Sequence, residues 1–163
     1  MADKIGRRIN VIGTSGSGKT TLAAQLAEQL DCTHVELDAL NWEANWTMAP
    51  TDIFRQRVAD ALQGDCWTVD GNYSRTRDVI WARSDTVIWL DYSLPRIYWQ
   101  LTRRTFRRIF LREELWNGNK ERFWVQFTSR DSIFYWVWTT YKRRRREYPL
   151  LLAKEENGHL TAV

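Results

Sequence analysis

Short apolar runs alternate with amphipathic patterns along most of this chain. Runs typical of buried strands cover residues 7–12, 33–37, 66–69 and 86–90. The last run is almost wholly apolar, as expected of a parallel strand that is covered on both faces. Patterns with helical spacing cover residues 19–30, 51–63, 76–82, 94–110 and 121–147, and the last helix is expected to end near Pro149. Residues 159–163 suit a last short strand.

This order predicts fold class α/β. Parallel strands joined by helices need cover on both faces, so we expect a three-layer α/β/α sandwich with a parallel sheet. The 163 residues suit a single domain, 1–163, and show no internal repeat or linker. Ligands of such sheets bind beyond the carboxyl ends of the strands. Asp38, Asp70 and Asp91 each follow a predicted strand directly and are therefore candidate site residues.

Residues 13–20 read Gly-Thr-Ser-Gly-Ser-Gly-Lys-Thr and fit the phosphate-loop pattern G-x-x-x-x-G-K-[ST] at every position. An expected strand precedes them and an expected helix follows, which is the context that the motif requires. The glycines permit turns that a side chain would forbid, so that N–H groups form an anion nest at a helix N-terminus. We expect ATP to be bound by Gly13, Thr14, Ser15, Gly16, Ser17, Gly18, Lys19, Thr20 and Thr21.

The residues outside the loop exclude two large classes of phosphate-loop protein. A GTPase needs an Asn-Lys-x-Asp motif after a late strand, and Asn119-Lys120-Glu121-Arg122 lacks the Asp. A motor or remodelling ATPase usually shows an apolar strand that ends in Asp-Glu, and neither Val69-Asp70-Gly71 nor Leu90-Asp91-Tyr92 does. The remaining pattern is that of a small-molecule kinase.

Residues 70–75, Asp-Gly-Asn-Tyr-Ser-Arg, resemble the Asp-Gly-(aromatic)-Pro-Arg segment of nucleoside monophosphate kinases. That resemblance implies that Asp70 holds Mg²⁺ through water, together with the Thr20 hydroxyl, and that Arg75 contacts the acceptor. The proline is absent here and Arg75 lies one place late, so the acceptor stays open.

Four segments extend the resemblance over nearly all of residues 8–163. They are Val35–Trp42, Val69–Tyr73, Trp89–Tyr92 and Glu114–Asn119. Together they resemble the bacterial DNA topology modulation proteins, which are related to adenylate kinases. The resemblance implies the fold of a nucleotide-kinase-like P-loop NTPase and the chemistry of a phosphotransferase that uses ATP and Mg²⁺.

Several residues are then candidates for catalysis and for contact with a small phosphate acceptor. Lys19 is expected to hold the donor phosphates. Asp38 would orient or deprotonate an acceptor hydroxyl, as the matching Asp does in shikimate-kinase-like enzymes, although a helix cap is an equally good interpretation. The expected acceptor pocket consists of Asp38, Trp42, Asn72, Tyr73 and Arg75.

Arginines dominate the second half of the chain. Residues 1–95 carry 9 Lys and Arg against 13 Asp and Glu, whereas residues 96–163 carry 15 against 7. We expect an arginine-rich helical lid at about 103–122, from which Arg104 and Arg108 reach the transferring phosphate, with Gly118 as a hinge. The alternative function is nucleotide-dependent DNA or RNA binding, which is less favoured because base-stacking and helix-turn-helix signals are missing.

The remaining composition bears on location and partners. Two cysteines, Cys32 and Cys66, show no metal-ligand spacing and make no disulfide framework, so we expect a reducing cytoplasm. No apolar run is long enough to span a membrane. Of the ten tryptophans, Trp67, Trp81, Trp89 and Trp99 are expected in the core. A monomer and a dimer are equally compatible with the sequence.

Overall fold

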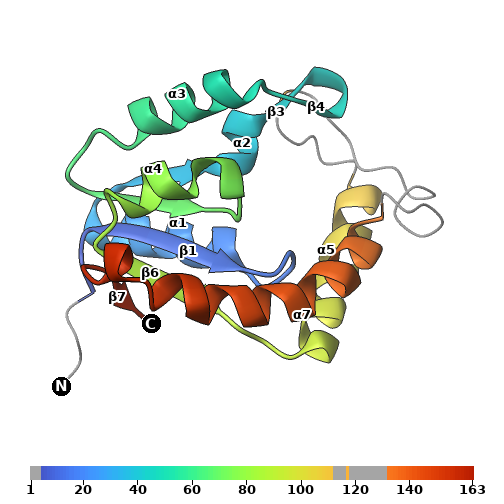
Figure 1. Cartoon of the computed structure of the whole chain (residues 1–163). Coiled ribbons are helices and arrows are strands. Elements are labelled where there is room, and N and C mark those ends of the chain that lie inside the picture. Colours follow the sequence, from blue (N-terminus) through green and yellow to red (C-terminus); the bar gives the residue numbers. More distant parts are fainter. Residues whose placement is uncertain (1–4, 112–116, 118–131) are drawn as a thin grey trace.

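The computed structural model describes residues 5–111, Asn117 and residues 132–163 (Figure 1). Its main sheet contains β1 (Arg8–Gly13), β2 (Thr33–Glu36), β5 (Trp67–Asp70), β6 (Thr86–Leu90) and β7 (Thr161–Ala162). The strands are all parallel and lie in the order β2-β5-β1-β6-β7. The parallel sheet predicted from the sequence is therefore confirmed, and its last strand is the short one expected near the C-terminus.

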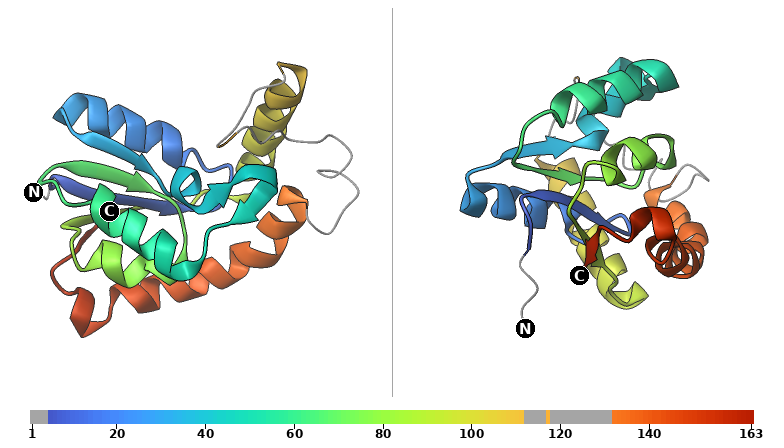
Figure 2. Two further views of the ribbon diagram at one scale, coloured as in Figure 1. Left: turned by 90° about the horizontal axis from the view of Figure 1, so that it is seen from above. Right: turned by 60° about the vertical axis from the view of Figure 1, so that its left-hand side comes forward.

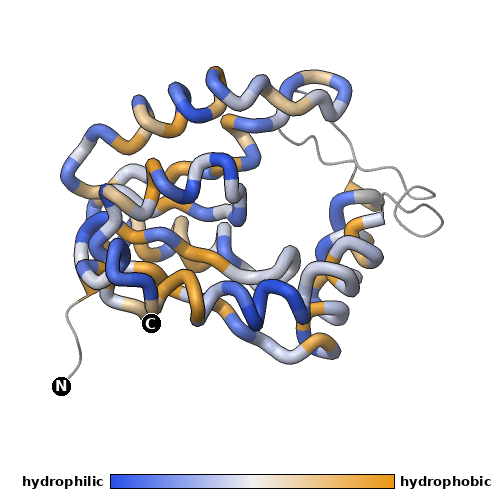
Figure 3. Tube along the Cα trace, viewed as in Figure 1, coloured by the Kyte–Doolittle hydropathy of each residue, from blue (hydrophilic) through white to orange (hydrophobic). Residues whose placement is uncertain are grey.

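Helices cover both faces of this sheet (Figure 2). On one face, α1 (Lys19–Leu30) packs Ala23 against Ile9, Val11 and Ile88. The larger core on the other face takes residues from α3 (Thr51–Ala61), α4 (Arg77–Trp81) and the C-terminal half of α7 (Ile133–Leu152). Apolar residues accordingly concentrate on the strands and on the helix faces toward them (Figure 3). The result is the predicted three-layer α/β/α sandwich.

Helix α5 (Leu94–Phe110) packs against the N-terminal half of α7 through a smaller core of Ile97, Leu101, Val137 and Tyr141. α5 and the N-terminal part of α7 lie beyond the carboxyl ends of the strands (Figure 1), whereas the C-terminal part of α7 packs on the sheet. The last helix was expected to end near Pro149. In the structure α7 continues through Pro149 to Leu152, and the carbonyl of Pro149 accepts a hydrogen bond from the N–H of Ala153. The helix begins after Ser132, whose side chain accepts the N–H of Phe134; the expected residues 121–131 lie outside the described part.

The segment between β2 and α3 is more structured than its sequence suggests. It contains α2 (Leu37–Asn41), two short antiparallel strands, β3 (Trp42–Glu43) and β4 (Thr47–Met48), and the 3₁₀ turn η1 (Ala44–Trp46) between them. Two further 3₁₀ turns are η2 (Ser74–Thr76) and η4 (Glu155–Asn157). The sequence of this segment shows neither a continuous apolar run nor a regular helical or alternating pattern, so these short elements were not predicted.

Cys32 and Cys66 form a disulfide bond, whereas the sequence analysis expected two separate thiols. Cys32 directly precedes β2 and Cys66 directly precedes β5, with Cα atoms 5.0 Å apart. Thr33 pairs with Trp67 across the neighbouring parallel strands, so the residues before them also lie side by side. Their 34-residue separation hides this proximity in the sequence.

Gly71, the residue directly after β5, is constrained both by its backbone conformation and by the side chain packed against it. Gly71 follows β5 with φ +141°, and a Cβ atom there would lie 2.8 Å from the Cβ of buried Leu37. We expect Gly71→Ala to lower the free energy of unfolding by about 2 kcal/mol, because it adds both backbone strain and overpacking. Urea denaturation followed by circular dichroism measures this change.

Gly64→Ala is the matched control, since Gly64 has open space around its Cβ position and no positive φ. It should leave the unfolding free energy within about 0.5 kcal/mol of the parent. Equal stability of the two variants would contradict the assigned constraint at Gly71.

Candidate active site

The loop between β1 and α1 has the backbone geometry of an anion nest. Gly13, Gly16 and Gly18 have φ angles of 149°, 84° and 89°, in the region that residues with a side chain rarely adopt. Gly18 is the N-cap residue of α1, and within the described residues the first turn has neither a side-chain cap nor an acidic residue. The N–H groups at this helix end are therefore available to an anionic ligand.

Neighbouring elements hold this loop tightly. A Cβ atom on Gly13 would lie 2.8 Å from the carbonyl oxygen of Leu90, and one on Gly16 would lie 3.1 Å from the Cβ of Leu101 on α5. The side chain of Asn72 bridges the loop from the other side, because Asn72 Nδ2 donates to the Gly13 carbonyl and the Gly13 N–H donates to Asn72 Oδ1 at 3.1 Å. Asn72 thus supports the loop, and its predicted contact with an acceptor stays a prediction.

The polar residues of the loop differ in exposure. Thr14 and Ser17 are buried, and the Ser17 N–H donates to the Thr14 carbonyl at 3.0 Å. Ser15 is half-buried, and Thr20 and Thr21 are exposed on the first turn of α1. Thr20 and Thr21 thus lie at the surface of the first turn of α1.

Lys19 lies at the centre of the site. Its Nζ donates to the carbonyl of Thr14 at 3.1 Å. The pKa of Lys19 is lowered to about 8, mainly by loss of hydration and next by the positive charge of Arg144, while the negative charges of Asp38 and Asp70 act in the opposite direction. The pattern places both carboxylates and a second cation close to the ammonium group, so several charged groups from different elements meet here.

Asp70, at the carboxyl end of β5, is buried and fully engaged. Its Oδ2 accepts the Thr20 hydroxyl at 2.5 Å, and its Oδ1 lies 3.0 Å from Nε2 of His34. The hydrogen bond to Asp70 raises the pKa of the half-buried His34. The sequence analysis missed His34, because its approach to Asp70 depends on the pairing of β2 with β5, in which His34 lies opposite Thr68.

Asp38 lies in the first turn of α2 and accepts a hydrogen bond from the hydroxyl of Tyr73. Asn41, one turn further along, donates to the same hydroxyl at 3.3 Å. Burial and the charge of Asp38 raise the pKa of Tyr73, so the phenol stays protonated and keeps donating. The structure therefore brings together Asp38 and Tyr73, which lie 35 residues apart.

Arg75 points toward the segment between β2 and α3. Its guanidinium donates to Asn41 Oδ1, to the Ala49 carbonyl at 3.3 Å and to Thr51 Oγ1 at 3.2 Å. It also lies 5.1 Å from the centre of the Phe54 ring. These contacts occupy much of the guanidinium and tie Arg75 to the segment between β2 and α3.

Trp42 lies in the same segment, at the start of β3. Its ring is half-buried and meets Trp46 edge to face at 5.5 Å, and its carbonyl accepts a hydrogen bond from Asn117 at 2.6 Å. This contact places Asn117 beside β3.

The two lid arginines predicted to act in transfer lie on α5. Arg104 and Arg108 are both half-buried, and Arg104 lies near enough to Lys19 to lower the pKa of its ammonium group. Trp99 on the same helix was expected in the core, but it is 63% exposed and carries Arg103 at 5.7 Å from its ring. That prediction was wrong because an aromatic residue on an amphipathic helix does not by itself show which face is buried.

The predicted hinge Gly118 and most of the expected lid, 112–116 and 118–122, lie outside the described residues. Arg104 and Arg108 lie within the regular helix α5, and their role in a lid stays a prediction.

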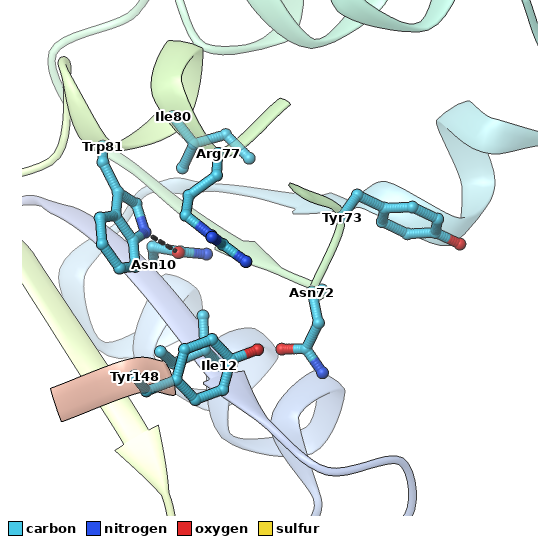
Figure 4. A pocket seen from close by; sticks show the side chains of 9 residues that line it. Asn10, Ile12, Asn72, Tyr73, Arg77, Ile80, Trp81 and Tyr148 are labelled. Carbon is cyan, nitrogen blue, oxygen red and sulfur yellow. Dashed lines mark hydrogen bonds between the residues drawn. The ribbon is translucent and has the colours of Figure 1, made fainter. Parts of the chain in front are cut away.

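A small cavity adjoins the site (Figure 4). It has a volume of ≈ 10 Å³, enough for about one water molecule. Arg77 lies between the rings of Trp81 and Tyr148, at 5.7 and 6.0 Å, and Trp81 Nε1 donates to Asn10 Oδ1 at 2.9 Å. The cavity is a packing gap beside Asn72 and is too small for an acceptor molecule.

Solved structures of small-molecule kinases share this fold. Shikimate kinase from Acinetobacter baumannii, in complex with shikimate, superposes with a TM-score of 0.56 at 16% identity, covering 97% of this chain and 83% of that one. A gluconokinase from Sinorhizobium meliloti 1021 gives 0.57 at 17% identity, covering 99% and 83%. Shikimate kinase from Bacteroides thetaiotaomicron gives 0.52 at 16%, covering 87% and 81%. At these identities the likeness establishes the P-loop kinase fold.

No curated protein sequence matches this chain significantly. In the described residues no helix is both long and apolar enough to cross a bilayer. The profile of the AAA domain family AAA_33 matches residues 9–92, a segment that runs from β1 through the phosphate loop to the end of β6. Since that match spans just over half of the 163 residues, the chain belongs to the AAA domain family AAA_33.

Proposed function

We propose that this protein is a phosphotransferase that moves the γ-phosphate of ATP, with Mg²⁺, to a small acceptor. The observation that carries this proposal is the loop of left-handed glycines before an uncapped helix N-terminus, where the Thr20 hydroxyl is hydrogen-bonded to Asp70. Phosphoryl transfer requires positioning and charge stabilisation more than covalent chemistry from the protein. These groups supply both at one end of the sheet.

The residues fit ATP and Mg²⁺. The loop amides suit a phosphate, and the oxygen atoms of Thr20 and Asp70 are hard ligands that already touch each other. Among the described residues no group of three or more His, Cys, Asp or Glu could hold a metal by itself. Mg²⁺ does not need one, because it usually keeps several waters and binds one or two protein groups beside the substrate phosphates. When bound, it would neutralise charge on the β- and γ-phosphate oxygens.

Asp38 is the proposed group that orients or deprotonates the acceptor. Its carboxylate is held by Tyr73 from one side and lies close enough to Lys19 to affect its pKa. An acceptor hydroxyl bound there would face the terminal phosphate. Because Arg75 is engaged by Asn41 and Thr51, we favour an acceptor that is recognised through its hydroxyl near Asp38 over a monophosphate gripped by Arg75.

Four finer assignments are part of this proposal. The four segments quoted above support membership of the DNA topology modulation proteins within the kinase-like fold. Residues 1–163 would form one domain whose lid spans about 103–122, and Arg104 and Arg108 would act from it. Trp42 and Asn72 would line the acceptor pocket. A cytoplasmic location suits an enzyme that consumes ATP.

Lys19→Ala should weaken nucleotide binding and abolish turnover, because the ammonium group is expected to hold the donor phosphates. Loss of a charge-assisted contact to the phosphates is expected to weaken ADP binding by about tenfold or more. Titration calorimetry measures the affinity, and ADP release in the presence of nucleosides, nucleotides and hydroxyl-bearing metabolites measures turnover and screens for the acceptor. Lys142→Ala, an exposed lysine on α7, is the control; equal losses in both variants would remove Lys19 from the mechanism.

Asp70→Asn should keep nucleotide binding and lose Mg²⁺-dependent transfer. The amide lacks the charge that attracts the cation, so we expect turnover to fall by about 100-fold, while ADP affinity measured without Mg²⁺ stays close to that of the parent. Asp65→Asn, which changes an exposed carboxylate before β5, should behave like the parent. A fully active Asp70→Asn enzyme would contradict the role of Asp70.

A further inference from the structure

Four polar side chains around α2 form one continuous hydrogen-bond chain. The guanidinium of Arg75 donates to Asn41 Oδ1, and Asn41 Nδ2 donates to the Tyr73 hydroxyl at 3.3 Å. That hydroxyl in turn donates to Asp38 Oδ1. The hydrogen-bond chain therefore connects the arginine to the aspartate through two intermediate side chains.

The direction of the hydrogen-bond chain is fixed by the chemistry of its members. An arginine side chain has only donors, so Asn41 must turn its amide oxygen toward Arg75 and its amino group toward Tyr73. That amino group can only donate, so the Tyr73 oxygen accepts from it and the hydroxyl proton is left for the carboxylate of Asp38. Reversal of one link would place two donors face to face.

Burial holds the hydrogen-bond chain in place. Asn41 is fully buried, and so is Phe54, whose ring centre lies 5.1 Å from that of Tyr73, edge to face, and 5.1 Å from Cζ of Arg75. Figure 4 shows Tyr73 and its neighbour Asn72 pointing in different directions, so the tyrosine is directed away from the residue that supports the phosphate loop. A buried amide that lost one partner would keep an unsatisfied polar group, and both links of Asn41 are therefore maintained together.

The last link restrains the carboxylate of Asp38. Because Oδ1 accepts from Tyr73, the carboxylate cannot rotate without losing that hydrogen bond, and Oδ2 keeps a fixed direction. A charged donor at the start of such a chain polarises the hydrogen bonds that follow it. The charge of Arg75 therefore strengthens the restraint on Asp38, although the two side chains are separated by Asn41 and Tyr73.

We propose that Arg75 is a positioning residue, which acts through Asn41 and Tyr73 to orient Asp38 toward the acceptor hydroxyl. This inference rests on the proposed function. It differs from the role that the sequence resemblance implies, in which Arg75 contacts the acceptor itself. It also gives a role to Asn41, which no sequence pattern selects.

A reaction in which water replaces the acceptor separates these two roles of Arg75. Water brings a hydroxyl to Asp38 but no phosphate that a guanidinium could bind. The measurement is ADP release from ATP and Mg²⁺ alone, with kcat and KM for ATP determined separately. We expect Arg75→Met and Tyr73→Phe each to lower kcat by about tenfold, with KM for ATP unchanged.

Three further variants show whether the loss is transmitted through the hydrogen-bond chain. Arg75→Met combined with Tyr73→Phe should lose no more than either change alone, because both interrupt the same chain. Arg75→Lys keeps a charged donor and should restore most of the rate. Arg57→Met is the matched control, since Arg57 ties α3 to the same segment through other partners, the Leu40 carbonyl at 3.1 Å and Glu43 Oε1 at 3.0 Å. It should hydrolyse ATP like the parent.

Two results of the hydrolysis assay would overturn the proposal. Hydrolysis by Arg75→Met at the rate of the parent would assign Arg75 to contact with the acceptor. An equal loss of kcat in Arg57→Met would assign Arg75 to holding the segment between β2 and α3 in place.

Proton NMR tests the hydrogen-bond chain without turnover, so its failure is distinct from that of the proposed function. A hydroxyl proton donated to a carboxylate resonates downfield of the amide protons, and Tyr73→Phe identifies the signal by removing it. Arg75→Met should move the signal upfield, whereas Arg57→Met should leave it in place. Absence of the signal in the parent, or a signal that Arg75→Met leaves unmoved, would overturn the proposal. The expected shifts in a protein that neither binds nor hydrolyses ATP would instead contradict the proposed function.

Discussion

The site depends on the register between β1 and β5. Val11 pairs with Asp70 in this parallel ladder, and the Gly71 N–H then donates to the Val11 carbonyl at 3.4 Å. That alignment places Asp70 beside the phosphate loop, which begins at Gly13, two residues after Val11. A shift by one residue would turn Asp70 to the other face of the sheet and separate it from Thr20. Backbone pairing thus fixes the geometry of the candidate metal site before any ligand binds.

The charges around Lys19 follow from the same alignment. Four charged residues from different elements influence the pKa of Lys19. They are Asp70 from β5, Asp38 from α2, Arg104 from α5 and Arg144 from α7. A polar network of this kind is costly when it is only partly satisfied. The loop amides, which no side chain caps within the described residues, are the part of this network that the proposed phosphate would satisfy.

The sequence predicted the parts of the fold that repeat over several residues. The five strands of the main sheet, α1 and α5 each carry enough periodicity to be located, and the phosphate loop is a local pattern whose geometry its glycines dictate. The pairing of Cys32 with Cys66, the hydrogen bond of His34 to Asp70 and the burial of Arg144 were not predictable in this way. Each depends on which elements become neighbours, and an arginine inside a run of four arginines looks no different from the others until the helix is packed. The same limit explains why Trp99 was placed in the core.

The central claim is that the turn between β1 and α1 holds the phosphates of ATP with Mg²⁺ beside Thr20 and Asp70. A crystal structure of the protein with Mg²⁺ and a non-hydrolysable ATP analogue tests it most directly. The account predicts that the β-phosphate lies within hydrogen-bond distance of the amides of residues 13–18, with the metal bound to the Thr20 hydroxyl. A nucleotide bound elsewhere, or phosphates that point away from Lys19, would contradict it.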